Sequence, residues 1–330
     1  MNILVIGLGS MGKRRIRLLK ELLGKDVLIA GIDQNMERIT QCESEFQIAT
    51  YTTLEAALEQ QNKFECAFIC TSPLAHSTLI RQCLLHGLHV FSELNLVADG
   101  YKENMALAAE KGVKLFLSST MIYRDEMQYL YREMSCVSEP VSYNYHVGQY
   151  LPDWHPWESY HDFFVGDKKT NGCREILAIE LPWIIRVFGS IMDIKVIRKK
   201  LTNLQIEYND CYMILISHKG GNSGMLMVDV VSRVPVRSLK VIGEHLFYAW
   251  EGTPNSFIRK DIQENKIEYI DLYEENCELG INNRTINEIQ YKNEMMQFFA
   301  ELDGKAESIY GFQDDLETLR TIDRIENTRI

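Results

Sequence analysis

The first twelve residues constrain this chain more than any other part of it. A short apolar run, Ile3–Ile6, has the composition of a buried strand and passes at once into glycines spaced as Gly-x-Gly-x-x-Gly. Apolar residues then recur at helical spacing through residues 13–23. A strand, a glycine turn and a helix in this order form a cradle for a dinucleotide pyrophosphate, because the backbone can approach the phosphates and the helix offers them free N–H groups. The expected contacts are Gly7, Gly9, Ser10, Met11 and Gly12.

An acidic residue follows at the distance that such a cradle requires. The second apolar run, residues 27–32, ends in Asp33, 21 residues beyond Gly12. A carboxylate here accepts hydrogen bonds from the adenosine ribose hydroxyls and repels a 2′-phosphate, which favours NAD over NADP. An ordinary turn aspartate is the alternative. NADP stays open because one of four basic residues could reach a 2′-phosphate, although solvated positions on the first helix suit them better: Lys13, Arg14, Arg15 and Arg17.

Composition limits the class of protein. A chain of 330 residues is long enough for about two domains. Its net charge is −11 and it has no extended basic cluster, so we expect no nucleic-acid partner. No apolar stretch has the length of a membrane span, and the N-terminal run leads into the glycine turn rather than a cleavage site. Eight cysteines without Cys-x-x-Cys spacing indicate reduced thiols, a cytoplasmic location and no metal site.

The pattern along the chain changes near residue 120. Up to that point strand and helix patterns alternate, which indicates a parallel sheet with helices on both faces. The strands are expected at 2–6, 27–32, 66–70, 88–92 and 113–117. We therefore predict an α/β protein whose first domain, residues 1–120, is a doubly wound Rossmann domain.

Residues 121–330 have the pattern of an α+β domain with an open, predominantly antiparallel sheet. A helix is expected at 173–188, and further helices near 285–302 and 311–326. The expected strands are 193–200, 204–217, 223–233, 236–242 and 245–250. Some of these strands are apolar on both faces. We therefore expect helices to cover one face and a second subunit the other, in a homodimer or homotetramer.

Residues 71–97 narrow the class further. A Thr-Ser-Pro-x-x-His turn at 71–76 follows an apolar run, and Gly-x-His-Val at 87–90 leads to Glu-Leu-Asn at 93–95. This order closely resembles the Gfo/Idh/MocA oxidoreductases, named after glucose–fructose oxidoreductase, inositol dehydrogenase and a rhizopine-catabolism protein. The resemblance continues through Ser118–Arg124 and covers essentially the whole chain. It implies an NAD(P)-dependent dehydrogenase or epimerase-like enzyme acting on a small-molecule carbohydrate, polyol or sugar derivative.

The resemblance and the strand-end position together predict further cofactor contacts. The 71–76 turn lies where ligands dock at the carboxyl end of a parallel sheet. Its hydroxyls and backbone are expected to hold the diphosphate or the nicotinamide ribose. We expect the histidine to brace the turn; an ordinary helix-cap or core histidine is the alternative. The expected contacts are Thr71, Ser72, Pro73, His76, Glu93 and Asn95.

Two departures from the family pattern concern catalytic groups. The family's Glu-Lys-Pro lysine, which the resemblance places at the nicotinamide ribose and the reacting hydroxyl, is Leu94 here. Leucine neither donates a hydrogen bond nor changes its protonation state. The family's helix carries an aspartate and a histidine four residues apart, which align with Glu175 and Ile179. A slip of one residue would place Glu180 at the histidine position. The usual lysine and histidine are therefore missing.

Replacement groups are expected in residues 145–161, which hold three histidines, two tryptophans and several tyrosines. Aromatic faces suit the C–H faces of sugars, and histidine suits proton transfer near neutral pH. We expect His146 or His161 to act as the base and Glu175 to orient substrate or base. An aromatic loop that stabilises a dimer is the alternative. Candidates for binding an anionic substrate are Lys168, Lys169 and Arg174.

The leading function hypothesis is hydride transfer from a sugar, polyol or nucleotide-sugar hydroxyl to nicotinamide, with a non-standard acid/base set. The variant triplet also resembles a branch associated with bacterial surface-sugar biosynthesis, which favours a nucleotide-linked or acidic sugar. Two other classes stay open. One is a dinucleotide-binding sensor or scaffold without dehydrogenase chemistry. The other is a redox-neutral epimerase or lyase with tightly held NAD.

Overall fold

The computed structural model describes residues 1–24, 27–59, 63–262, 264–273 and 288–327. It divides into two compact units. The first is Met1–Ser119 with Glu294–Leu316, and the second is Thr120–Asn293 with Glu317–Ile330. The sequence predicts two consecutive segments with a boundary at 120/121, whereas residues 294–316 return to the first unit. The division therefore runs through two helices, α8 (Ile289–Leu302) and α9 (Phe312–Asn327).

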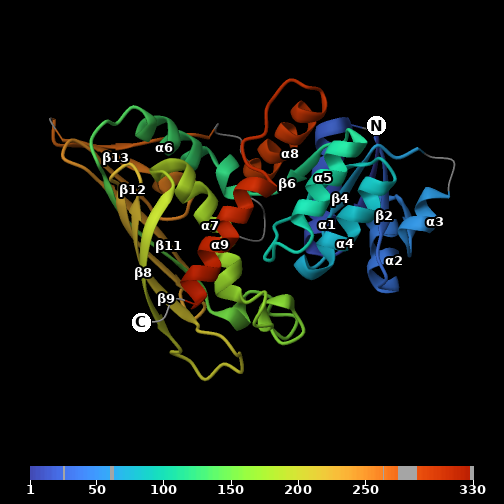
Figure 1. Ribbon diagram of the computed structural model, residues 1–330, viewed down its shortest axis with the longest axis horizontal. Helices are drawn as coiled ribbons and strands as arrows, with labels where there is room; N and C mark the ends of the chain where they lie inside the picture. Colours follow the sequence, from blue (N-terminus) through green and yellow to red (C-terminus); the bar gives the residue numbers. More distant parts are fainter. Residues whose placement is uncertain (25–26, 60–62, 263, 274–287, 328–330) are drawn as a thin grey trace. The chain divides into compact units, whose positions relative to one another are not determined.

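A parallel six-stranded sheet forms the centre of the first unit, in the order β3-β2-β1-β4-β5-β6 (Figure 1). Its strands are β1 (Asn2–Ile6), β2 (Leu28–Ile32), β3 (Ala49–Tyr51), β4 (Cys66–Ile69), β5 (His89–Ser92) and β6 (Leu115–Leu117). Its connecting helices are α1 (Ser10–Leu23), α2 (Met36–Phe46), α3 (Leu54–Leu58), α4 (Pro73–Leu85) and α5 (Tyr101–Lys111). The order reverses between β1 and β4, where sheets of this kind bind their ligands.

Phenylalanines from three neighbouring strands show why the C-terminal segment belongs to the first unit. Phe91 of β5 stacks on Phe68 of β4 and Phe116 of β6, with ring centroids 4.6 and 5.0 Å apart. Phe298 of α8 meets each of these three rings edge-on at 5.5 Å. All four side chains are buried. Aromatic pairs favour such offset and edge-to-face arrangements, so residues from α8 complete the core of the Rossmann sheet.

An eight-stranded sheet dominates the second unit, in the order β14-β13-β12-β11-β7-β10-β9-β8. Only β7 and β10 pair in parallel. The strands are β7 (Ser142–Gly148), β8 (Ile191–Lys199), β9 (Cys211–His218), β10 (Ser223–Asp229), β11 (Val236–Ile242), β12 (Phe247–Trp250), β13 (Ile258–Asp261) and β14 (Lys266–Tyr269). The predicted fold class, a Rossmann domain plus a mainly antiparallel α+β domain, is thereby confirmed.

Helices cover one face of this second sheet. They are α6 (Asp125–Ser135) and α7 (Gly172–Phe188), and short 3-10 helices lie at Thr120–Tyr123, Leu151–Asp153, Phe164–Gly166 and Pro254–Ser256. The covered face is fixed by Tyr143 of β7, which stacks on Phe188 at 4.2 Å, and by Tyr145, whose hydroxyl donates to Glu180. Strand side chains alternate between faces, so Asn144, the residue between these tyrosines, points the other way.

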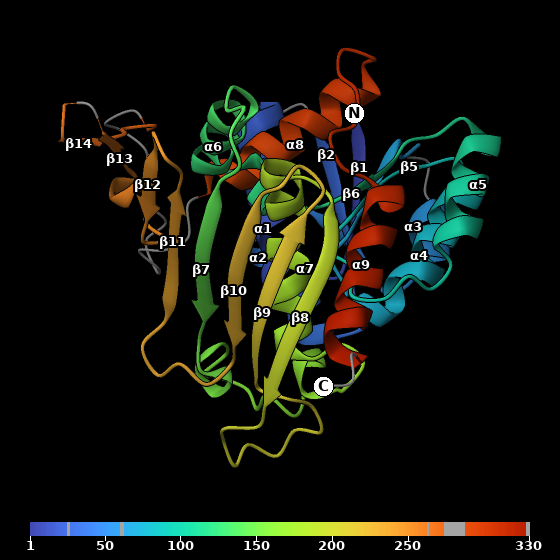
Figure 2. The same cartoon turned by 60° about the vertical axis from the view of Figure 1, so that its left-hand side comes forward.

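The opposite face of the sheet is rich in exposed apolar side chains, and Figure 2 shows the sheet with this face toward the viewer. Neighbouring strands contribute large side chains that are between 38% and 52% exposed: Ile197, Met213, Leu215 and Met225. The apolar character on both faces of these strands, predicted from the sequence, is therefore present in the structure.

One predicted strand is wrong at its beginning. The pattern predicts a strand over 204–217, but β9 begins only at Cys211. The preceding loop is held by the buried carboxylate of Asp210, which accepts the backbone N–H groups of Leu201 and Thr202 and the Thr202 hydroxyl. These backbone N–H groups bind a side chain instead of a neighbouring strand. A pattern of alternating apolar residues cannot show this difference.

Seven cysteines lie in the described residues, and all of them are free thiols. Cys277 lies outside the described residues. No described helix has both the length and the apolar character that crossing a bilayer requires.

Candidate functional site

The glycine turn between β1 and α1 is packed too tightly for side chains at two of its three glycines. Gly7 has φ +96°, and a Cβ there would lie 2.7 Å from the carbonyl oxygen of Cys70. A Cβ at Gly12 would lie 1.9 Å from the carbonyl oxygen of Gly7. A Cβ at Gly9 would meet its nearest neighbour, the Arg38 guanidinium, only at 3.9 Å. No side chain caps the N-terminus of α1, so the turn and the helix end fit a pyrophosphate.

Asp33 is fixed against the same turn at the end of β2. Its Oδ2 accepts the N–H of Leu8 at 2.7 Å, and its Oδ1 accepts the N–H of Asn35 at 2.8 Å. Each carboxylate oxygen keeps a second lone pair for a ribose hydroxyl. The half-exposed guanidinium of Arg38 lies 3.8 Å from Asp33 Oδ2. The sequence pattern does not single out this cation, which lies five residues beyond Asp33 near the start of α2 and forms an ion pair with it.

The turn after β4 is braced by a buried histidine. His76, in α4, donates from Nε2 to the Thr71 carbonyl at 2.9 Å. Its Nδ1 lies 2.7 Å from the side-chain amide of Asn95, and burial lowers the pKa of His76. The Asn95 atom next to Nδ1 is Oδ1, and the amide Nδ2 of Asn95 donates to the Ser92 hydroxyl at 3.5 Å. The Asn95 side chain is therefore bound to His76.

The 71–76 turn also leaves a polar atom for a ligand. The buried hydroxyl of Thr71 has no hydrogen-bond partner in the described structure, and neither has the Ser119 hydroxyl just beyond β6. Ser72 occupies the position before α4 without capping it, and Pro73 begins that helix. Two buried hydroxyls without partners near the carboxyl edge of one sheet indicate that a bound group supplies the missing hydrogen bonds.

The expectation that the basic residues of the first helix are solvated is wrong for Arg15. Its side chain is fully buried. It donates to both carboxylate oxygens of Glu93, at 2.5 and 3.1 Å, and to Glu294 of α8 at 2.8 Å. A buried guanidinium requires such partners, because an unpaired charge in the interior is costly. The Glu93 carboxylate, predicted as a cofactor contact, is therefore held by Arg15.

In the second unit, Glu175 lies on the partly exposed side of α7. Residues 175 and 179 are partly exposed while residues 176–178 between them are buried, so the aligned pair shares one side of the helix. Glu175 Oε2 is buried and has no hydrogen-bond partner among the described residues. Burial raises the pKa of Glu175 to about 8. An unpaired carboxyl group with this pKa exchanges protons near neutral pH.

Glu180, the alternative from a one-residue slip, lies in the core instead. Its carboxylate accepts from the Tyr145 hydroxyl at 2.8 Å, the indole N–H of Trp183 at 2.6 Å and the guanidinium of Arg237 at 2.7 Å. The side chain is fully buried. These bonds give Glu180 a structural role between α7 and the sheet.

His146 extends from the open face of the second sheet. It lies between Tyr145 and Val147, which are buried on the α7 side, and its Nε2 is 2.7 Å from Oδ2 of Asp229 on β10. Burial raises the pKa of Asp229, but hydrogen bonds from His146 and from the backbone of residues 231 and 232 outweigh it, and the net pKa is lowered. His146 and Glu175 thus lie on opposite sides of the sheet.

His161 lies in the 149–170 loop, exposed, with its ring 4.2 Å from that of Tyr160. Among the described residues, no hydrogen bond joins any two of the three predicted catalytic residues. Arg174, a candidate for anion binding, is bound to Asp323 and Glu326 of α9.

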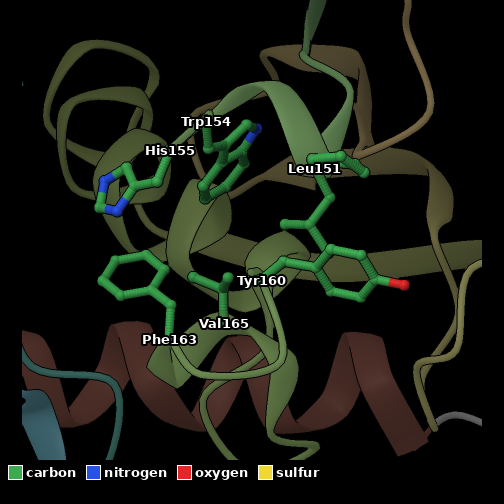
Figure 3. A pocket seen from close by; sticks show the side chains of 7 residues that line it. Leu151, Trp154, His155, Tyr160, Phe163 and Val165 are labelled. Atoms are coloured by element: carbon green, nitrogen blue, oxygen red, sulfur yellow. The ribbon is translucent and has the colours of Figure 1, made fainter. Parts of the chain in front are cut away.

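The aromatic loop packs largely against itself. Figure 3 shows the small cavity that it encloses, lined by Leu151, Pro152, Trp154, His155, Tyr160, Phe163 and Val165. The cavity measures about 10 Å³, which suits one water molecule at most and not a sugar ring. Trp157 is 73% exposed and stacks on His155, whose Nδ1 lies 2.5 Å from the Glu158 carboxylate. Within the 149–170 loop, Trp157 is the exposed residue among the tryptophans, tyrosines and phenylalanines. Its ring is therefore the aromatic face of this loop that is most open to a ligand.

These features define a dinucleotide-binding Rossmann protein with a second α+β domain. Residues 1–119 match a family model, GFO_IDH_MocA, described as "Oxidoreductase family, NAD-binding Rossmann fold". The resemblance of residues 1–119 to the Gfo/Idh/MocA oxidoreductases and the prediction of NAD as the cofactor are thereby confirmed.

A curated relative and two solved structures extend the comparison. Biliverdin reductase A of Mus musculus is 32% identical over 137 residues, 41% of this chain and 44% of the mouse protein, so the match spans less than half of that relative. An Agrobacterium radiobacter oxidoreductase solved with NAD⁺, L-tartaric acid and magnesium has a TM-score of 0.82 at 16% identity, over 100% of this chain and 97% of its own. UDP-N-acetylglucosamine 3-dehydrogenase GnnA from Acidithiobacillus ferrooxidans has a TM-score of 0.76 at 14% identity, over 99% and 96%. These structural similarities show the fold.

Proposed function

We propose that this protein is an NAD(P)-dependent oxidoreductase that interconverts a hydroxyl and a carbonyl group on a sugar, polyol or nucleotide sugar. Glu175 carries the proposal, because its Oε2 atom is buried without a hydrogen-bond partner among the described residues and its pKa of about 8 suits proton exchange with such a hydroxyl. The GnnA neighbour, whose name specifies a nucleotide-sugar substrate, supports this substrate class. A cytoplasmic location belongs to the same proposal and rests on the free thiols.

The cofactor supplies or accepts the hydride when bound. The glycine turn, Asp33 and the Thr71 hydroxyl would hold its phosphates and riboses. Because Leu94 and Ile179 stand where the family has lysine and histidine, neither of those positions can move a proton. We therefore assign the proton step to Glu175. In the oxidising direction it accepts the hydroxyl proton, and in the reducing direction it donates a proton to the carbonyl oxygen.

The test is an absorbance assay at 340 nm with purified protein and a panel of sugars, polyols and UDP-sugars. Biliverdin joins the panel because one matched relative is named as its reductase. With an active substrate, Glu175→Gln is expected to lower kcat by about 10²–10⁴-fold. Asp193→Asn, which removes an exposed carboxylate of the same unit, serves as the matched control. His146→Ala and His161→Ala test the remaining predicted bases.

The two directions have opposite pH dependence. Oxidation needs ionised Glu175 and rises as pH increases through about 8, whereas reduction needs the protonated form and falls over the same interval. Dinucleotide binding with no turnover on any panel member would favour the sensor or scaffold. Turnover without net NADH release would favour the redox-neutral enzyme.

A further inference from the structure

The turn between β4 and α4 depends on His76 for its shape. Ser72 precedes α4 without a capping hydrogen bond from its side chain, so the usual anchor of a helix entry is missing. Instead, Nε2 of His76 donates across the turn to the Thr71 carbonyl at 2.9 Å. Threonine is β-branched and restricted at χ1, so fixing its backbone largely fixes its hydroxyl. The buried Thr71 hydroxyl, which has no partner in the described structure, is therefore placed by His76.

His76 is itself held by hydrogen bonds that lead away from the turn. A hydrogen bond of 2.7 Å joins Nδ1 of His76 to Oδ1 of Asn95. The Asn95 side chain also hydrogen-bonds the Tyr101 hydroxyl, which donates to Oδ2 of Asp315 in α9 at 2.6 Å. All four residues are at most 3% exposed and belong to the first unit. We call His76, Asn95, Tyr101 and Asp315 the Asp315 network.

The carboxylate at one end of this network sets the direction of its hydrogen bonds. Burial and the neighbouring Asp315 raise the pKa of Tyr101, so its hydroxyl keeps its proton. A phenol has one proton to donate, and Tyr101 gives it to Asp315. The phenol oxygen therefore accepts from the Asn95 amide, which leaves Oδ1 of Asn95 for His76. Without Asp315, the Tyr101 proton would be free to turn toward Asn95 and reverse its amide.

Close packing keeps the centre of the network in place. Gly100, with φ +69°, precedes α5, and a Cβ at this position would overlap the hydroxyl oxygen of Ser77 in α4. The absence of a side chain thus lets α5 begin directly against α4. The ring of Tyr101 also meets Phe312 of α9 edge-on, with ring centroids 4.7 Å apart. A change at α9 can therefore reach the turn through side chains that have little room to absorb it.

We propose that the Asp315 network positions the Thr71 hydroxyl for the bound dinucleotide, so that a carboxylate of α9 helps to set the affinity for NAD. Tyr101 and Asp315 are in this view positioning residues, because they act through Asn95 and His76 rather than by touching the cofactor. The inference rests on dinucleotide binding and not on the sugar substrate proposed above.

The order of the strands indicates which half of the cofactor the network serves. Asp33 at the end of β2 marks the adenosine side, and a dinucleotide crosses the sheet at the β1/β4 reversal. The turn that carries Thr71 follows β4, so its hydroxyl faces the half beyond the adenosine. AMP contains only the adenosine half. Loosening the network is therefore expected to weaken NAD binding and to leave AMP binding unchanged.

The experiment measures the dissociation constants of NAD⁺ and AMP for the full-length protein by titration calorimetry. Tyr101→Phe removes the hydroxyl between Asp315 and Asn95 and keeps the ring that packs on Phe312. It is expected to raise Kd for NAD⁺ about fivefold, the effect of one hydrogen bond, and to leave Kd for AMP as in the wild type. Asn95→Leu breaks the network at a second point, and the same result is expected from it if Tyr101→Phe does not fold.

Tyr310→Phe is the matched control. Its hydroxyl donates to the other oxygen of the Asp315 carboxylate, also at 2.6 Å, but does not lead to the turn. The control is expected to lower Tm by about as much as Tyr101→Phe and to bind NAD⁺ like the wild type. Thr71→Val tests the other end of the network. The double variant with Tyr101→Phe is expected to bind NAD⁺ no more weakly than Thr71→Val alone, because both changes remove the same contact.

Three results would overturn the inference while leaving the cofactor site in place. They are equal NAD⁺ affinities of Tyr101→Phe and Tyr310→Phe, a parallel loss of AMP affinity, and additive effects of Thr71→Val and Tyr101→Phe. A wild-type protein that binds no dinucleotide would reject both this inference and the proposed function.

Discussion

Replacing Glu175 with glutamine is expected to stabilise the protein above pH 8 and to leave its stability unchanged near pH 4. The carboxyl group has an ordinary pKa of 4.5 and, through burial, a pKa of about 8 in the folded protein. A group with a raised pKa contributes stability that is fully present below the unfolded pKa and is lost as pH rises through the folded pKa. Glutamine has no such ionisation, so only the wild type loses stability between pH 4.5 and 8.

The size of the effect follows from the same values. At about 1.4 kcal/mol for each pH unit, the interval from 4.5 to about 8 corresponds to about 5 kcal/mol at most. Glu175 is partly exposed, so solvent reduces the cost of ionising it. We expect the stability difference between Glu175→Gln and wild type to increase by about 2 kcal/mol from pH 5 to pH 9.

Urea unfolding followed by far-UV circular dichroism at pH 5, 7 and 9 measures this difference. Asp193→Asn controls for the loss of one negative charge from the same unit. A Glu175→Gln difference that stays constant with pH would show that Glu175 ionises in the folded protein as in the unfolded chain. That result would remove the physical basis for assigning the proton step to it.

Four further changes test other parts of the structure. Gly12→Ala places a methyl group against the carbonyl of the glycine turn and is expected to weaken NAD binding more than about tenfold in a fluorescence titration; unaltered affinity would contradict the cradle. Asp33→Ala is expected to weaken NAD far more than NADP, and an equal loss for both would reject the ribose contact. Arg237→Met leaves the buried carboxylate of Glu180 without its cation and is expected to lower the free energy of unfolding, measured in urea, by about 3–5 kcal/mol. An unchanged free energy would show that the Tyr145 hydroxyl and the Trp183 indole are sufficient partners for this carboxylate. Leu215→Glu on the open sheet face tests the proposed homodimer or homotetramer, because light scattering is expected to show a lower mass than the wild type, and a monomeric wild type would reject the assembly.

The parts of the fold that the sequence predicts well are those with a strong local signal. β1 and β4 consist almost entirely of apolar residues and are buried on both faces, and the glycine spacing defines the turn before α1. By contrast, β3 has three partly exposed or exposed residues, and β14 is mostly exposed, so neither shows an apolar pattern. Both depend on pairing with a neighbouring strand rather than on their own composition.

The candidate site was predictable only where its residues are local in the chain. Gly7, Gly12 and Asp33 follow from spacing alone. The burial of Arg15 could not be predicted in this way, because helical periodicity does not distinguish a solvated arginine from one buried between carboxylates. Its partner Glu294 is 279 residues away in the chain. The side of the sheet to which His146 points could not be predicted either. It depends on how β7 pairs with β10 and β11, which come later in the chain.

The return of residues 294–316 to the Rossmann unit has a consequence for synthesis. While the ribosome is still making the second unit, Arg15 has only one of its two carboxylates and the rings of Phe68, Phe91 and Phe116 lack Phe298. The nucleotide domain can therefore not finish folding until residues 294–316 have been made, after the whole of the intervening segment 120–293. A fragment ending at residue 119 would contain the whole glycine cradle and still expose the aromatic surface that α8 covers. Such a fragment is a poor choice for isolating the cofactor site, and a fusion that joins α8 to it would be the better one.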